Sequence, residues 1–169
     1  YITAEGVVVA EDVHAPYSGP IASRFILDNG NFAALSESGL IAAWGDGSST
    51  LNQSAPVGDG YTQIFSNKFA FCALHADGSV SAWGDSSAGG SLGNKAADLA
   101  EGVINIVPTA STFTALKSDG AVVTWGNYLG NTYGNASAPN EISDVSKVAT
   151  TQNAIAVVTK SGVIHAWGN

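Results

Sequence analysis

The chain has 169 residues, of which 45% are apolar and only 12% are charged. Fourteen acidic against six basic residues give a formal net charge of −8. Nucleic acids and anionic membranes require clusters of Lys and Arg, so this balance disfavours both as partners. No apolar run reaches the length of a membrane span, and the length of the chain is enough for one domain with a core of its own.

In chain order, the sequence predicts short strands separated by loops rich in Gly, Ser and Asn. A hairpin over residues 1–12 comes first, and a linker with two prolines follows it. Four longer units come next, each with a lead strand and then a hairpin, at about residues 21–46, 61–85, 102–127 and 144–169. The lead strands are predicted at residues 25–27, 61–66, 103–107 and 145–149. One short helical turn is expected over residues 95–99, and no long helix.

Each hairpin turns at a glycine. The aligned glycines are Gly6, Gly39, Gly78, Gly120 and Gly162. Aspartate precedes this glycine in two copies, and Asp-Gly between alternating apolar runs predicts a two-residue primed turn. Such a turn needs positive φ, which glycine adopts at little cost.

The two strands of each hairpin alternate in character with a period of two. One face carries small or β-branched residues, such as Leu74, Val80 and Ala82. The other face ends in an indole, at Trp44, Trp83, Trp125 and Trp167. Both faces need burial, so we expect the units to stack with each indole over the small residues of the following unit. The period of about forty residues predicts an all-β, propeller-like stack or β-solenoid: four repeats of three or four strands and an N-terminal half repeat.

The motif Ala-Leu-x-x-Asp-Gly-x-Val-x-x-Trp-Gly-Asp/Asn resembles the regulator of chromosome condensation repeat family, and its short bacterial-type repeats in particular. The resemblance covers about residues 21–169 and implies a β-propeller, usually of about seven blades. Four copies and a half fall short of that number, so an open stack is as consistent with the sequence as a closed ring. The eukaryotic founder of the family exchanges guanine nucleotide and binds chromatin, but this chain shows no residues that would carry either role.

The numbers of cysteine and methionine residues help to indicate the cellular location of the protein. Cys72 is the one cysteine, and its alignment with small residues favours a buried, inert thiol over a reactive one. The chain contains no methionine, which indicates that a signal or pro-segment was removed or that the chain is part of a longer protein. Together with the low charge and the polar loops, this favours a secreted or cell-surface protein.

Several residues match catalytic or ligand-binding patterns, but structural roles explain them better. His14, His75 and His165 lie apart from Cys and from paired carboxylates, which favours surface or structural roles over a metal site. Ser91 lies in a G-x-S-x-G pattern, but a nucleophile elbow needs a strand before it and a helix after it, so a loop is favoured. The polar residues after each Trp-Gly are expected to form Asx turns rather than a calcium site. They are Asp46, Asp85, Asn127 and Asn169.

Two further features concern the surface. Asn52 and Asn135 begin N-x-Ser sequons, which are either glycosylation acceptors of a secreted eukaryotic protein or chance matches. Tyr128 and Tyr133 lie in one loop, and such a pair of rings is a candidate contact for a glycan or a peptide. No cofactor is expected.

The two ends of the predicted stack differ from its interior. Glu11 occupies the tryptophan position of the opening hairpin, and no unit follows Trp167. A head-to-tail contact between copies would cover both ends and give a ring or a filament. We therefore expect a non-enzymatic, self-associating extracellular scaffold. The alternative is a module that binds a ligand, glycan or protein within a larger surface protein, and an enzyme ranks third because no catalytic constellation is found.

Overall fold

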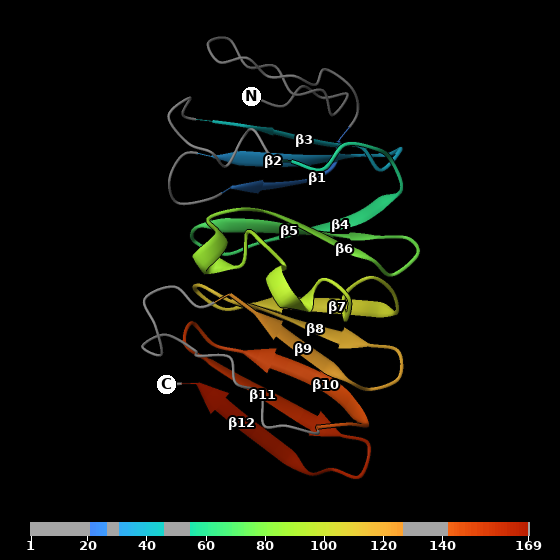
Figure 1. Cartoon of the computed structure of the whole chain (residues 1–169), viewed down its shortest axis with the longest axis vertical. Coiled ribbons are helices and arrows are strands. Elements are labelled where there is room, and N and C mark those ends of the chain that lie inside the picture. The colour runs from blue at the N-terminus through green and yellow to red at the C-terminus, as the bar shows by residue number, and fades with distance from the viewer. Residues whose placement is uncertain (1–20, 27–30, 46–54, 127–141, 169) are drawn as a thin grey trace.

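The described residues form four three-stranded antiparallel sheets, one per repeat, which lie one after another along the long axis (Figure 1). The computed structural model describes residues 21–26 (backbone), 31–45, 55–126 and 142–168. The strands are β1 (Ile21–Ile26), β2 (Phe32–Ser36) and β3 (Ile41–Trp44) in the first sheet, β4 (Tyr61–Ser66), β5 (Ala70–His75) and β6 (Val80–Gly84) in the second, β7 (Val103–Pro108), β8 (Phe113–Lys117) and β9 (Val122–Trp125) in the third, and β10 (Val145–Thr150), β11 (Ala154–Thr159) and β12 (Ile164–Gly168) in the fourth.

The predicted all-β stack of four repeats is confirmed. Three lead strands lie where they were predicted, whereas the first begins at Ile21, four residues before its predicted start. Each sheet of the described chain uses strands of one repeat only, in sequence order, and none joins the last repeat to the first. The described part is therefore an open stack. The predicted half repeat at residues 1–12 lies outside it. No helix among the described residues is long and apolar enough to cross a bilayer.

The hairpins turn at the predicted glycines, but the predicted turn type is wrong. In the second repeat, His75 N–H donates to the Ser79 carbonyl over 2.9 Å, and Gly78 N–H donates to the His75 carbonyl over 3.0 Å. The loop therefore has three residues. Either primed turn needs positive φ at its first central residue, which would be Asp77, whereas Asp77 stays outside the positive region and Gly78 has φ 84°. The pattern is that of a type I turn followed by a left-handed residue, which still requires the glycine.

The loop after β6 carries the only 3-10 turns that the structure describes, η2 (Ser86–Ala88) and η3 (Gly93–Lys95). Leu99 N–H donates to the Lys95 carbonyl over 3.1 Å, so the predicted helical turn is confirmed. The Leu99 carbonyl in turn accepts from Val80 N–H over 3.0 Å, which ties the loop back to β6. Leu99 itself is fully buried between the second and third sheets.

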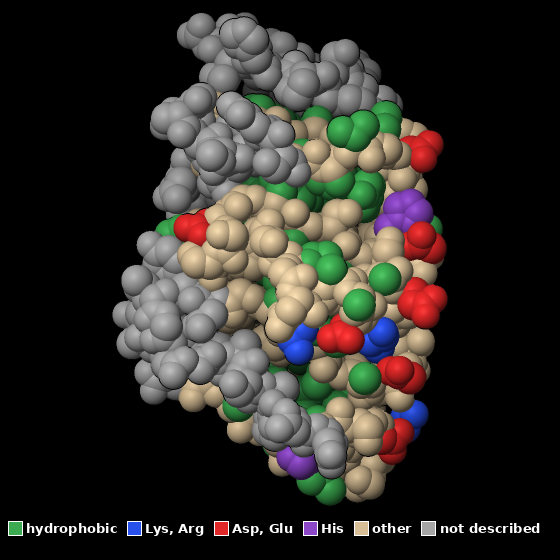
Figure 2. Space-filling model, in the orientation of Figure 1, with side chains coloured by type: hydrophobic (Ala, Val, Ile, Leu, Met, Phe, Trp, Pro, Cys, Tyr) green, Lys and Arg blue, Asp and Glu red, His purple; other side chains and the backbone are tan. Residues whose placement is uncertain are grey.

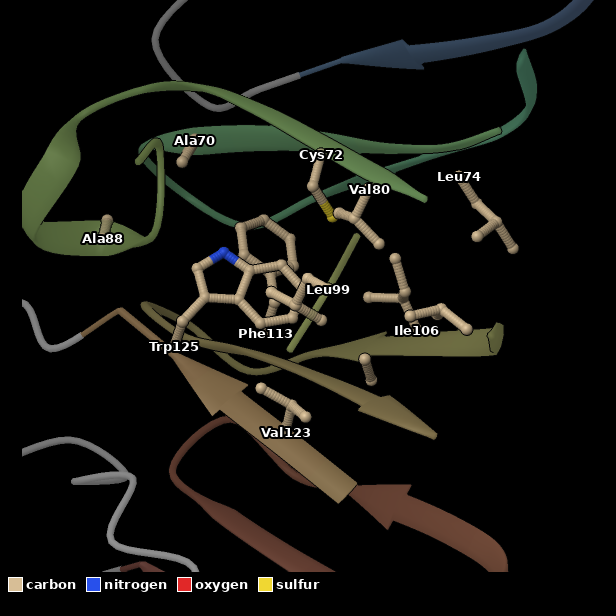
Figure 3. Close-up of a cluster of buried hydrophobic side chains, with 12 residues drawn as sticks. Ala70, Cys72, Leu74, Val80, Ala88, Leu99, Ile106, Phe113, Val123 and Trp125 are labelled. Carbon is tan, nitrogen blue, oxygen red and sulfur yellow. The ribbon is translucent and has the colours of Figure 1, made fainter. Parts of the chain in front are cut away.

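The hydrophobic core lies between consecutive sheets. In Figure 3, Phe113 and Trp125 of the third repeat point toward Cys72 and Val80 of the second. The same layering joins the first repeat to the second and the third to the fourth. Each repeat thus buries its faces only against its neighbours, as in other repeat proteins.

Each indole faces the preceding repeat, so the predicted direction of stacking is wrong. Trp83 packs with Ala33 of the first repeat, and Trp125 packs with Cys72 of the second. Trp167 lies against the cluster that contains Leu116 of the third repeat. Trp167 therefore belongs to an internal interface, and the other side of its sheet is the outer one.

Candidate interaction site at the end of the repeat stack

A stacked aromatic pair fills each of the first two internal interfaces. The Phe71 and Trp83 rings lie 5.2 Å apart at 20°, and the Phe113 and Trp125 rings lie 5.4 Å apart at 29°. All four side chains are at most 4% exposed. The facing sheet offers small side chains, so large groups meet small ones at the density that a protein interior requires.

The loop that follows one repeat closes over the indole of the next. Trp125 Nε1 donates to the Gly89 carbonyl over 3.0 Å, and Asn67 Nδ2 donates to the neighbouring Ala88 carbonyl over 2.7 Å. A Cβ on Gly89 would come within 2.9 Å of the Phe113 ring. The glycine-rich run around Ser91 therefore serves packing, a role that its resemblance to a nucleophile elbow did not suggest.

The turn glycines bring consecutive repeats into backbone contact. The Gly78 carbonyl accepts from Val103 N–H, the first residue of β7, over 3.0 Å. A Cβ on Gly78 would lie 2.7 Å from the Gly102 nitrogen, which leaves no room for a side chain. Glycine is thus required here twice, for its positive φ and for this close approach.

The fourth repeat has one bare apolar face. We call it the open face, and it consists of Ala154, Ala156, Val158, Ile164 and Ala166. Both sides of β5 are buried, whereas along β11 buried and half-exposed residues alternate. Ile164 is 69% exposed, while its counterpart Val80 in the second repeat is 7% exposed. Figure 2 shows hydrophobic side chains at this lower end of the stack.

A shallow cleft of about 310 Å³ lies beside the third repeat. It is lined by the loop residues 86–87 and 91–95 and by Thr124, Trp125 and Gly126. Its side chains are mostly small and polar, and its volume is at the lower end for ligand pockets. The cleft therefore offers hydrogen-bonding groups around the edge of the Trp125 indole.

Three predicted structural roles are confirmed. Asp85 caps η2, because its Oδ1 accepts from Ser87 N–H over 2.8 Å and from the Ser87 hydroxyl over 2.6 Å. Cys72 is fully buried, and burial raises the pKa of its thiol well above the usual value, which disfavours the reactive thiolate. Ser91 is exposed on a loop between two 3-10 turns, and its hydroxyl accepts from Gly93 N–H over 3.3 Å.

His75 lies at a hairpin turn, partly exposed as predicted. Its Nδ1 is 2.9 Å from Asp77 Oδ1, and its Nε2 is 3.1 Å from the Asp59 carbonyl. Hydrogen bonds from the Ser79 hydroxyl and amide, with a further one from His75, lower the pKa of Asp77 to about 2. The described residues hold no group of three or more His, Cys, Asp or Glu side chains that could bind a metal ion.

The remaining predicted site residues stay predictions, because they lie outside the part that the structure describes. They are Glu11, His14, Asp46, Asn52, Asn127, Tyr128, Tyr133, Asn135 and Asn169.

No family model and no curated protein matches the sequence. Solved structures do match it. The chain is similar to Prp20p, the RCC1 of Saccharomyces cerevisiae, with a TM-score of 0.63 and 18% identity over 88% of this chain. It is also similar to the ectodomain of the receptor kinase CR4 from Physcomitrella patens, with a TM-score of 0.59 and 16% identity over 94% of this chain. Human WBSCR16 gives a TM-score of 0.59 and 16% identity over 96%.

These likenesses show the fold. The four sheets are RCC1-like β-propeller repeats, as the sequence motif indicated. The chain spans about half the length of the structures it matches, namely 44% of Prp20p, 42% of CR4 and 54% of WBSCR16.

Proposed function

We propose that this chain is a non-enzymatic interaction scaffold, which binds another protein through the open face of its repeat stack. The observation that carries the proposal is the exposure of this face. Its counterparts in the three preceding repeats all lie in internal interfaces. A contiguous apolar surface exposed to water is a usual sign of a protein interface.

The structural likenesses support a protein as the ligand. Prp20p is described with binding properties toward Gsp1p and histones, and yeast RCC1 has been solved bound to Kap60. The fold is thus one that carries protein partners. At 18% identity no particular partner transfers to this chain.

For the partner itself, we propose a second copy of the chain, bound head to tail in a ring or a filament. The alternative is that the chain forms part of a larger surface propeller, which would hold a protein or a glycan with loop residues such as Tyr128 and Tyr133. For the location, we propose the cell exterior or surface, since the chain has few charged residues and many Ser, Asn and Gly.

Sedimentation velocity of the purified chain tests self-association. The concentration series should run from about 1 µM to about 1 mM, which covers about 4 kcal/mol of binding free energy. We expect the weight-average mass to rise with concentration and electron microscopy to show rings or filaments. A monomer throughout this range would exclude self-association and leave the larger-propeller alternative.

A further inference from the structure

We infer that the open face is a socket for one three-stranded repeat of a partner protein, which docks as the next layer of the stack and fills it with a stacked Phe-Trp pair. This inference rests on the proposed binding of a protein at the open face, and it names the class of partner. The three internal interfaces are its template, because each joins the same two faces of consecutive repeats.

The side chains of the open face indicate which kind of repeat fits. In the second repeat, the same face is built mainly of small residues, and the third repeat covers it with Phe113 and Trp125 (Figure 3). The small residues of that face are Ala70, Cys72 and Ala82. The open face has alanine at the same three positions, namely Ala154, Ala156 and Ala166. It therefore offers the same room for two stacked rings.

The third repeat shows what a different face accepts. At the positions of Cys72 and Ala82 it has Thr114 and Thr124, whose hydroxyls lie 3.0 Å apart. The fourth repeat packs on this side with Ile155 where the third repeat has Phe113. Because the open face lacks these hydroxyls, it matches the second repeat better than the third, and a Phe-Trp pair is the occupant that fits it.

The backbone of the fourth repeat has a free acceptor for a following lead strand. The carbonyls of the three earlier turn glycines each accept from the first N–H of the next lead strand: Gly39 from Tyr61 at 3.1 Å, Gly78 from Val103 at 3.0 Å, and Gly120 from Val145 at 3.0 Å. Gly162 has the same left-handed φ of 87°, but its carbonyl receives no such bond within the described residues. The first N–H of the partner's lead strand is the matching donor.

The space at this glycine is free as well. A Cβ on Gly39, Gly78 or Gly120 would meet backbone atoms of the next repeat at 2.6 to 2.8 Å. A Cβ on Gly162 would meet no described atom within 4 Å. The fourth turn therefore has room for the same close approach of a lead strand.

A backbone donor lies at the other end of β11. Lys68 N–H donates to the Ala110 carbonyl over 3.3 Å, and Ala110 N–H donates to the Gln152 carbonyl over 2.8 Å. These residues occupy the same turn in consecutive repeats. Gln152 N–H, next in this line, has no acceptor in the described part of the chain. A docked sheet of the same size would satisfy both Gly162 and Gln152.

A repeat of known structure tests the socket when it is attached to the chain. In this extended chain, a second copy of residues 86–126 follows Asn169, so the loop and the third repeat come after Trp-Gly-Asn as they normally come after Trp-Gly-Asp. Trypsin cleavage after the copy of Lys117 releases the copy of residues 118–126, and intact-mass spectrometry measures the rate. This rate follows the fraction of copies that are undocked when docking is fast relative to cleavage.

Four variants of the original repeats test the face. Ile164→Asp puts a charge on the open face, and Gly162→Asn keeps a residue that tolerates left-handed φ but adds a Cβ at the docking point. Each should speed cleavage of the copy at least about tenfold. Ile104→Asp, at another exposed apolar residue (58%), and Gly93→Asn, at another glycine with an open Cβ position, should change the rate less than about twofold.

Two changes within the copy test the rings. Trp125→Ala should speed cleavage at least about tenfold, and Phe113→Ile, which imitates the fourth repeat, at least about threefold. In the Ile164→Asp background the copy is already undocked, so Trp125→Ala should add less than about twofold. A role of the indole within the copy alone would give the same effect in both backgrounds.

The outcomes separate this inference from the proposed self-association. A copy that is cut equally fast with and without Ile164→Asp would overturn the socket, and so would equal effects of Trp125→Ala in the two backgrounds. If circular dichroism shows that Ile164→Asp unfolds the unextended chain, Gly162→Asn takes its place in both tests. A docked copy together with a monomeric wild type in sedimentation would support the socket and overturn self-association. An associating wild type whose extended form leaves its copy undocked would keep the scaffold and overturn the socket.

Discussion

Removal of the Trp83 indole tests the packing between repeats most directly. The side chain is 1% exposed and stacks on Phe71. A tryptophan buries about 150–250 Å², which is worth about 4–6 kcal/mol at about 25 cal/mol/Å². Alanine keeps the Cβ and the neighbours relax in part, so Trp83→Ala should lower the free energy of unfolding by about 3–5 kcal/mol. Urea unfolding followed by far-UV circular dichroism measures this loss.

Phenylalanine at two positions separates the hydrogen bond from the ring. Trp125 Nε1 donates to the buried Gly89 carbonyl, whereas Trp83 Nε1 has no acceptor among the described residues. Trp125→Phe leaves that carbonyl without its donor, so it should cost about 1–3 kcal/mol more than Trp83→Phe. Equal losses for the two Phe variants, or a loss below about 1 kcal/mol for Trp83→Ala, would refute this account.

Three further variants test the turns and the interior. Gly78→Ala places a Cβ 2.7 Å from a backbone nitrogen, and its unfolding free energy should fall at least about 1 kcal/mol further than that of Gly93→Ala, which meets no described atom; equal losses would contradict the close approach. Because turn hydrogen bonds depress the folded pKa of Asp77 from 3.8 to about 2, its stabilising effect is present above pH 3.8 and is lost as the pH falls toward 2. The thermal midpoint should therefore fall more steeply over this range in the wild type than in Asp77→Asn, and parallel curves would count against it. Thr114→Val leaves the Thr124 hydroxyl, 3.0 Å away, without its partner and should cost about 1–3 kcal/mol, while the double valine variant should recover most of that loss; additive losses in the denaturation cycle would disprove the coupling.

The repeat pattern could predict much of the fold, because its determinants are local. Alternation with a period of two marks a strand wherever it occurs, and glycine marks a turn that needs positive φ. The lead strands at 61–66, 103–107 and 145–149 were predicted to within a residue of their observed ends. The Asx turn at Asp85 depends on two neighbouring residues, so it too was predictable.

The turn type and the site were not predictable in the same way. The residues that close the hairpin decide whether Asp77 must adopt positive φ or only Gly78 does. Here the closing residues are His75 and Ser79, and only Gly78 has positive φ. The bond from Trp125 to Gly89 joins residues 36 positions apart across two repeats. No local pattern pairs an indole with a particular carbonyl at that separation.

The sequence by itself determined the class of the fold, the number of full repeats and the two kinds of face that each sheet presents. Only the tertiary structure decided which neighbour each face meets. A period of two shows which side chains share a face, but it has no direction along the stack, since that depends on the path of the loop between sheets. That direction places Trp167 inside the third interface and leaves Ile164 on the open face, which is where we locate the interaction.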